Sequence, residues 1–136
     1  MSEKIPEAAH PLLDEVTFAH VVTLMPDGMP QTTPVWVTRD GDVAVFNTAA
    51  GRAKHRNLVR DPRCALSVTA PDNPYTYLQL RGTVELVEDG AVDGPFGINA
   101  LSHKYMGRDY PFLQPGEQRL VVRLTPDAVD YHAPPG

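Results

Sequence analysis

Residues typical of turns divide the chain into short runs of apolar and β-branched residues, and this pattern limits the folds that the chain can adopt. Pro26-Asp27-Gly28 and Asp40-Gly41 separate three such runs near the N-terminus. The spacing is typical of strands joined by tight turns, so we expect the three runs to form an antiparallel meander. The predicted strands span Phe18 to Met25, Gln31 to Thr38, Asp42 to Asn47, Arg63 to Ala70, Tyr75 to Val87 and Arg119 to Leu124.

Two residues inside these runs are poor strand formers. Pro34 has no N–H to donate to a neighbouring strand, which predicts an edge or a bulge between Thr33 and Trp36. Gly82 predicts a bulge or a barrel corner in the long strand. Many short strands with such corners favour a small closed β-barrel over a sandwich, because closure removes exposed sheet edges.

Helices are predicted between the strands. One turn is expected near Ala8 to Glu15, a second helix over the basic segment after the third strand, and a third from Ile98 to Tyr105, ended by Gly107. The expected fold class is therefore mainly β with inserted helices. A chain of 136 residues fits a single domain over 1–136, with an N-terminal arm or helix at 1–16 and a loop with a short helix at 88–118.

The net charge and the cysteine content limit the partners and the cellular location that we expect. The formal net charge of -5 argues against nucleic-acid binding, which depends on neutralising phosphates with a basic surface. Cys64 is the only cysteine, so no intramolecular disulfide is possible and a cytoplasmic location is expected. We expect Cys64 to pack as a small hydrophobic residue. No apolar run is long enough to cross a bilayer, so membrane insertion is not expected.

One short segment is nevertheless strongly basic. Five of the twelve Lys and Arg residues lie in GRAKHRNLVRDPR at 51–63. If this segment is helical, Arg52, Arg56 and Arg60 share one face and repel one another at a spacing of four residues. An anionic ligand would relieve that repulsion. The free N–H groups of the first turn, entered from Thr48-Ala49-Ala50-Gly51, favour a phosphate.

The basic segment also has a simpler interpretation. Its charges would be solvated on an exposed helix face, with Asp61 pairing weakly with Arg60 or Arg63 at the surface. Charge spacing alone does not decide between the two interpretations.

The sequence has no side-chain constellation for catalysis. The five histidines are scattered without ligand-spaced partners, so no metal site is expected. Nucleophile-elbow, Walker and dinucleotide-binding motifs are also missing from the sequence. A phosphate-binding segment without an acid, base and nucleophile group indicates that a bound organic cofactor supplies the reactivity. The catalytic residues remain unknown.

Taken together, these features resemble a known family. The matching parts are the strand with Pro34-Val35-Trp36, the strand end Phe46-Asn47-Thr48, the segment GRAKHRNLVRDPRCALSV and the strand YLQLRGTVELV. They resemble the pyridoxamine 5'-phosphate oxidase-like split-barrel superfamily, with an FMN-binding-like split β-barrel, and within it the group that uses the deazaflavin coenzyme F420. The most specific part is R-x-K-x-R-N-L-x-x-D-P-R, beginning at Arg52.

The resemblance implies a homodimer with the cofactor in a groove between the subunits. By motif, Arg52, Lys54 and Arg56 would bind the cofactor phosphate, and Thr48 and Asn57 would add hydrogen bonds. The strand Thr32-Thr33-Pro34-Val35-Trp36 would lie along the tricyclic ring, with backbone groups bonded to its pyrimidine edge. Trp36 would either stack on the ring or pack in the core.

The resemblance further implies an F420-dependent oxidoreductase that passes hydride to a small electron-poor organic substrate. Tyr105, His103 and Tyr110 are candidate proton donors near the expected pocket rim. The alternatives are an FMN-dependent oxidase or reductase of the same fold and a non-catalytic F420-binding carrier. No pattern of the family can be assigned residue by residue to residues 88–136, so the sequence does not identify the substrate.

Overall fold

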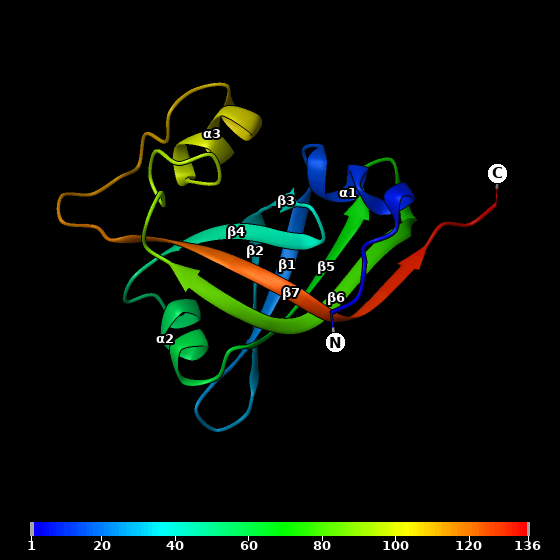
Figure 1. Ribbon diagram of the computed structural model, residues 1–136, viewed down its shortest axis with the longest axis horizontal. Coiled ribbons are helices and arrows are strands. Elements are labelled where there is room, and N and C mark those ends of the chain that lie inside the picture. Colours follow the sequence, from blue (N-terminus) through cyan, green and yellow to red (C-terminus); the bar gives the residue numbers. More distant parts are fainter. Residues whose placement is uncertain (1, 136) are drawn as a thin grey trace.

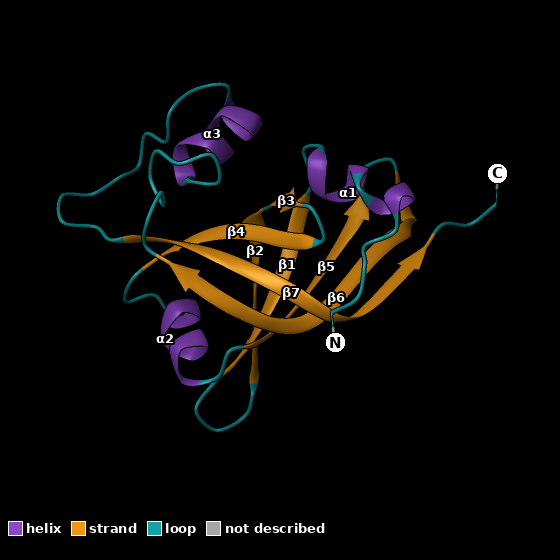
Figure 2. Cartoon of the chain, viewed as in Figure 1, coloured by secondary structure: helices purple, strands orange, loops and turns teal. Residues whose placement is uncertain are grey.

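The computed structural model describes residues 2–135, within which seven strands form one antiparallel sheet (Figure 1). Figure 2 shows how the helices sit outside this sheet. The helical elements are η1 (Glu7–Ala9), α1 (Pro11–Asp14), α2 (Ala53–Arg60) and α3 (Ile98–Met106). The strands are β1 (Phe18–Leu24), β2 (Pro30–Trp36), β3 (Thr38–Asp40), β4 (Val43–Ala49), β5 (Arg63–Ala70), β6 (Asn73–Val87) and β7 (Arg119–His132).

The sheet has to curl because two consecutive strands lie at its opposite edges. The strand order is β2-β1-β5-β6-β7-β4-β3, yet only Val37 separates the end of β2 from the start of β3. Two residue steps of extended chain span about 7 Å, so the two edges must come close together. Among the described residues β2 pairs only with β1, and β3 only with β4. The curled sheet is therefore a split barrel, which confirms the predicted fold class.

The predicted meander of the first three strands is wrong. β1 and β2 do form an antiparallel hairpin, but β4 pairs with β3 and β7 rather than with β2. The cause is the interruption at Val37, where the chain leaves one edge of the sheet and joins the other. β7 also continues to His132, well beyond the predicted end at Leu124.

The two interrupted strands behave as their residues indicate. Pro34 lies in β2, an edge strand, where a residue without an N–H is tolerated. At Gly82 the register between β6 and β7 shifts. A Cβ at this position would lie 2.0 Å from the carbonyl oxygen of Thr125, so only glycine lets the two strands approach this closely.

The core fills the inside of the curled sheet. Strand alternation sends Leu66 and Val68 of β5 and Leu78 and Leu80 of β6 inward, where all four are buried. Cys64 is buried on the same side of β5, and burial raises the pKa of its thiol to about 12. Its environment is that of a small packed residue. Within residues 2–135 no helix has the length and apolar character needed to span a membrane.

Candidate functional site

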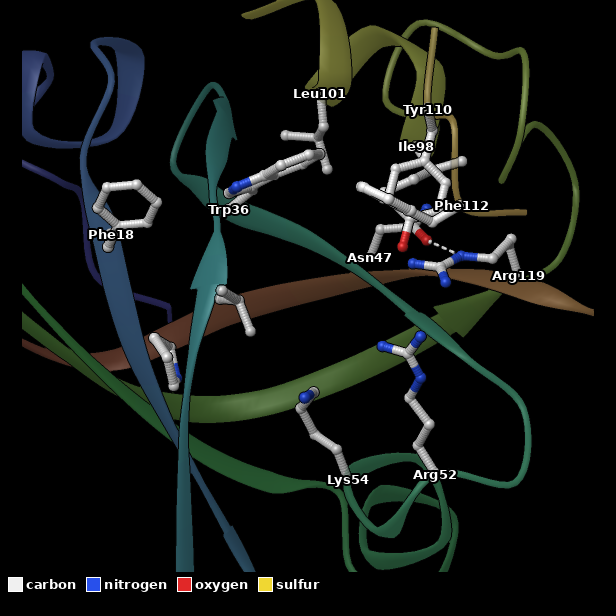
Figure 3. A pocket seen from close by; sticks show the side chains of 12 residues that line it. Phe18, Trp36, Asn47, Arg52, Lys54, Ile98, Leu101, Tyr110, Phe112 and Arg119 are labelled. Atoms are coloured by element: carbon white, nitrogen blue, oxygen red, sulfur yellow. Dashed lines mark hydrogen bonds between the residues drawn. The ribbon is translucent and has the colours of Figure 1, made fainter. Parts of the chain in front are cut away.

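A cleft of about 360 Å³ opens beside the N-terminal end of α2 (Figure 3). Its walls come from β1, β2, β4, α2, α3, the loop after α3 and the start of β7. The lining residues are Phe18, Pro34, Val35, Trp36, Asn47, Arg52, Lys54, Ile98, Leu101, Tyr110, Phe112 and Arg119. This set contains three cations, four aromatic rings and no carboxylate. Such a lining suits an anionic group attached to a flat apolar body.

Lys54 extends from the first turn of α2 into the cleft (Figure 3). Its ammonium donates a hydrogen bond to Thr33 Oγ1 at 3.1 Å and pairs with no carboxylate of the described residues. Burial, together with the positive charges of Arg52 and Arg119, lowers the pKa of Lys54. The ammonium is therefore in a position where an additional negative charge would be favourable.

Arg119 begins β7 and is the buried cation of the cleft, with 5 % of its surface exposed. Its Nε donates to Asn47 Oδ1 at 2.8 Å, a bond drawn in Figure 3. Asn47 in turn donates from Nδ2 to the carbonyl oxygen of Ala91 at 2.9 Å. The ring of Tyr110 lies 5.3 Å from the guanidinium carbon of Arg119. These contacts fix the guanidinium between β4 and the loop that follows α3.

Arg52 stands at the N-cap of α2 and provides no side-chain cap to the helix. The N–H groups of the first turn are therefore not satisfied by a capping side chain. The guanidinium, half exposed, reaches towards Arg119 (Figure 3) and lies 3.7 Å from Glu117 Oε1. Helix start and side chain together present positive potential to the cleft.

The opposite wall of the cleft is aromatic. Trp36 stacks on Tyr105 with ring centroids 5.1 Å apart and an interplanar angle of 12°. Tyr110 meets Trp36 edge-on at 6.0 Å, and Phe112 contacts Tyr110 in the same way at 5.6 Å. Phe18 and Phe112 are more than half exposed, so apolar surface remains open at the rim.

Two residues of α3 hold this wall against the barrel. The Tyr105 hydroxyl accepts a hydrogen bond from the backbone N–H of Val37 at 2.9 Å and donates to the carbonyl oxygen of Thr17. Lys104 donates to the carbonyl oxygens of Val37 at 2.6 Å and of Leu13 at 2.7 Å. Burial raises the pKa of Tyr105 and lowers the pKa of Lys104 to about 8.

Comparison with known proteins identifies the family of the chain. Residues 5–133 match the family model described as pyridoxamine 5'-phosphate oxidase. The chain belongs to the pyridoxamine 5'-phosphate oxidase family. A solved F420 reductase is 35 % identical, with 93 % of this chain and 98 % of that protein covered and a TM-score of 0.77. The family and the group that the sequence resembles are thereby confirmed.

More distant members of this fold extend the comparison. A conserved hypothetical protein from Mycobacterium tuberculosis, Rv2991, is 22 % identical over 94 % of this chain and 84 % of its own, with a TM-score of 0.75. General Stress Protein 26 from Bacillus anthracis is 16 % identical over 91 % of this chain and 90 % of its own, with a TM-score of 0.70. At these identities the similarity shows the split-barrel fold alone.

Half of the site residues predicted from the family motif line the cleft. Arg52 and Lys54 do so from α2, and Pro34, Val35 and Trp36 do so from β2. Thr33 does not line the cleft but accepts the hydrogen bond from Lys54, and Thr32 is exposed on the same strand. Their contact with a cofactor stays a prediction.

The other predicted residues have partners elsewhere in the chain. Arg56 donates to the carbonyl oxygen of Gly51 and is exposed. Asn57 is buried, with 3 % of its surface exposed, and its amide donates to Thr23 Oγ1 at 3.0 Å. Thr48 is fully buried in β4, and its Oγ1 has no hydrogen-bond partner among the described residues. Neither Arg56, Asn57 nor Thr48 lines the cleft.

The candidate proton donors also differ in whether they line the cleft. His103 is exposed and pairs with Asp109 at 2.7 Å, and the Tyr105 hydroxyl is engaged by backbone groups. Of the three candidates, Tyr110 alone lines the cleft.

Sequence reasoning missed Arg119 and Asn47 as site residues. The alternation of β7 holds a usable signal, because Val122 and Leu124 face the core and Arg119 must face the other way. The alternation does not say what lies on that other side. In the structure it is the loop after α3, whose sequence has no periodicity to place it.

Proposed function

We propose that the protein is an F420-dependent oxidoreductase that transfers hydride from the reduced deazaflavin to a small electron-poor organic substrate. One observation carries the proposal, namely that three cations and an aromatic wall line the same cleft without any carboxylate. F420 joins a negatively charged, phosphate-bearing tail to a planar tricyclic ring, so each part has a matching side. The similarity to a solved F420 reductase over 93 % of the chain supports the choice of cofactor.

The residues present fit such a group. The uncompensated ammonium of Lys54 and the guanidinium of Arg52 would bind the phosphate, with the N–H groups at the start of α2 beside them. The edge strand β2 has one row of backbone groups without a strand partner among the described residues, and these would bond the pyrimidine edge of the ring. The contacts that the motif assigns to Arg56, Asn57 and Thr48 would require a rearrangement of the hydrogen bonds described above.

When bound, the deazaflavin supplies a carbon that passes hydride in two-electron steps. The chain's own residues bind and orient the reactants. Trp36, Ile98 and Leu101 provide an apolar surface that excludes water from the reacting atoms. Tyr110 is placed at the cleft, where its hydroxyl would donate a proton to the reduced substrate.

The proposal includes a homodimer in which a second copy covers the cleft. Phe18 and Phe112, exposed by 56 % and 58 %, leave an apolar rim of the kind that a ligand or a subunit covers. Light scattering of the purified protein tests this part. A mass of one chain at all concentrations would exclude it.

Titration with oxidised F420, followed by quenching of the cofactor's fluorescence, tests the assignment directly. Saturable binding is expected, with weaker or no binding of FMN in a parallel titration. A yellow preparation with flavin absorbance would instead support an FMN-dependent enzyme. Binding of F420 without hydride transfer to any enone or quinone in a substrate panel would support a carrier protein.

A further inference from the structure

Glu117 contacts two of the three cations of the cleft, although it does not line the cleft itself. It lies two residues before Arg119, and its side chain is mostly buried, with 13 % exposed. Its Oε1 accepts a hydrogen bond from Arg119 Nη1 at 3.0 Å and lies 3.7 Å from Arg52 Nη2. Its Oε2 accepts a hydrogen bond from the backbone N–H of Gln114 at 3.1 Å. One carboxylate thus faces both guanidiniums.

The two contacts of Glu117 differ in strength. The contact with Arg119 has hydrogen-bond length, whereas the contact with Arg52 does not. Arg119 is also held by Asn47, while the side chain of Arg52 is half exposed and has no other hydrogen-bond partner among the described residues. Arg52 is therefore the cation that an incoming anion can take from Glu117.

The carboxylate remains charged at neutral pH. Burial raises the pKa of Glu117, but hydrogen bonds from Gln114 and Arg119 outweigh burial and hold the pKa below its usual value. An ionised Glu117 attracts Arg52, so an anion that binds Arg52 has to replace this contact. Lys54 has no carboxylate partner among the described residues, so an anion that binds it meets no such competition.

We propose that Glu117 is a specificity-determining residue that competes with a bound anion for Arg52 and thereby limits how much negative charge the cleft accepts. The proposal rests on the anion-binding role of the cleft in the proposed function. A ligand phosphate bridges Lys54 and Arg52, and Glu117 then keeps only its contact with Arg119. The alternative is that Glu117 orients Arg52 for the ligand, and the two roles predict opposite effects of removing its charge.

Calorimetric titration with inorganic pyrophosphate, and separately with oxidised F420, distinguishes these roles. Glu117→Gln keeps the size of the side chain and removes its charge, so both ligands are expected to bind roughly three- to tenfold more tightly at low salt. The gain should shrink as salt is added, since screening weakens the attraction between Glu117 and the half-exposed Arg52. Glu117→Asp, which keeps the charge, should show no gain.

A double-mutant cycle with Arg52→Ala makes the test specific. If Glu117 competes for Arg52, Glu117→Gln in the Arg52→Ala background should gain less than about twofold. Glu7→Gln on the exposed η1 turn removes the same charge away from the cleft and should leave both affinities unchanged. Glu117→Ala provides a second neutral variant should Glu117→Gln fail to fold.

Unchanged or weaker binding in the folded neutral variants would overturn the proposal, as would an equal gain in the Arg52→Ala background. Tighter pyrophosphate binding without any F420 binding would support the role of Glu117 and contradict the proposed cofactor. F420 binding that Glu117→Gln leaves unchanged would do the reverse. If neither ligand binds, both proposals fail.

Discussion

The two halves of the basic segment have different surroundings, although their charges look equivalent in the sequence. Arg52 and Lys54 face the cleft. Arg60 donates to the carbonyl oxygen of Leu24 and to Asn57 Oδ1, and Arg63 pairs with Asp61 at 2.8 Å. The first half is available to a ligand and the second is occupied by the protein. A run of cations can therefore serve binding at one end and stability at the other.

The largest expected effect comes from removing the two charges that line the cleft, and the control removes two charges that do not line it. Arg52→Ala with Lys54→Ala should weaken F420 binding by roughly 2–4 kcal/mol, because two charge-assisted contacts are lost. The charge-matched control, Arg56→Ala with Arg63→Ala, should weaken it by less than about 1 kcal/mol, since only long-range attraction is lost. Fluorescence titration of both double variants gives the comparison. Equal losses would mean that only total charge matters.

Asn57 tests whether a motif residue can belong to the supporting half. Its buried amide donates to Thr23 Oγ1 and to Gln31 Oε1, and its Oδ1 accepts from Arg60 at 3.1 Å. Asn57→Ala should lower the free energy of unfolding by about 1–3 kcal/mol, measured by urea denaturation, because buried polar groups lose their partners.

The exposed neighbour Arg56 is the control for this variant. Arg56→Ala should change the free energy of unfolding by no more than about 0.5 kcal/mol. If Asn57→Ala left stability unchanged and abolished F420 binding, Asn57 would be a cofactor contact as the motif implies.

A variant of Tyr105 tests whether this residue of the aromatic wall supports the structure or takes part in the reaction. Tyr105→Phe keeps the stacking on Trp36 but leaves the N–H of Val37 without its acceptor. The free energy of unfolding should therefore fall by about 1 kcal/mol, measured by urea denaturation. Tyr75→Phe, at a tyrosine that is 72 % exposed, should have no effect. Unchanged stability with a collapsed rate of hydride transfer would make Tyr105 a proton donor.

The last prediction concerns Lys104, a cation whose ammonium donates its hydrogen bonds to backbone carbonyl oxygens and does not line the cleft. Its pKa is about 8 in the folded chain against a usual 10.5. Between these values the unfolded chain keeps a proton that the folded chain has lost, so the free energy of unfolding should rise with pH across this window. Urea denaturation of the wild type and of Lys104→Met from pH 8 to pH 10.5 isolates the contribution. A difference that falls as pH rises would contradict it.

The local structure was largely predictable, and the pairing was not. Alternation and turn residues located six of the seven strands but not β3, and Gly107, with a φ of 74°, ends α3 as expected. The break at Val37 carries no signal of its own, because a valine continues a strand as readily as it ends one. The exchange of sheet edges there follows from the packing of the whole barrel.

The lining of the cleft was predicted in part, for Arg52, Lys54 and the segment from Pro34 to Trp36, and was missed where it depends on distant segments. The helix begins at Ala53, so Arg52 stands at the N-cap rather than on one helical face with Arg56 and Arg60. Arg119 reaches the cleft only because β7 runs beside β4, a pairing between residues about seventy positions apart. Spacing in the sequence contains no information on such a contact.

The close approach of β6 and β7 at Gly82 has a consequence for the cleft. From that crossing the two strands stay paired as far as Val87 and Val121, and β7 begins two residues before Val121 at Arg119, so the register set at Gly82 carries through to the cleft lining. Any side chain larger than a hydrogen atom at this position would force β6 and β7 apart. The placement of Arg119 thus depends on a strand register fixed outside the cleft lining, and we expect a substitution at Gly82 to weaken ligand binding without touching the ligand.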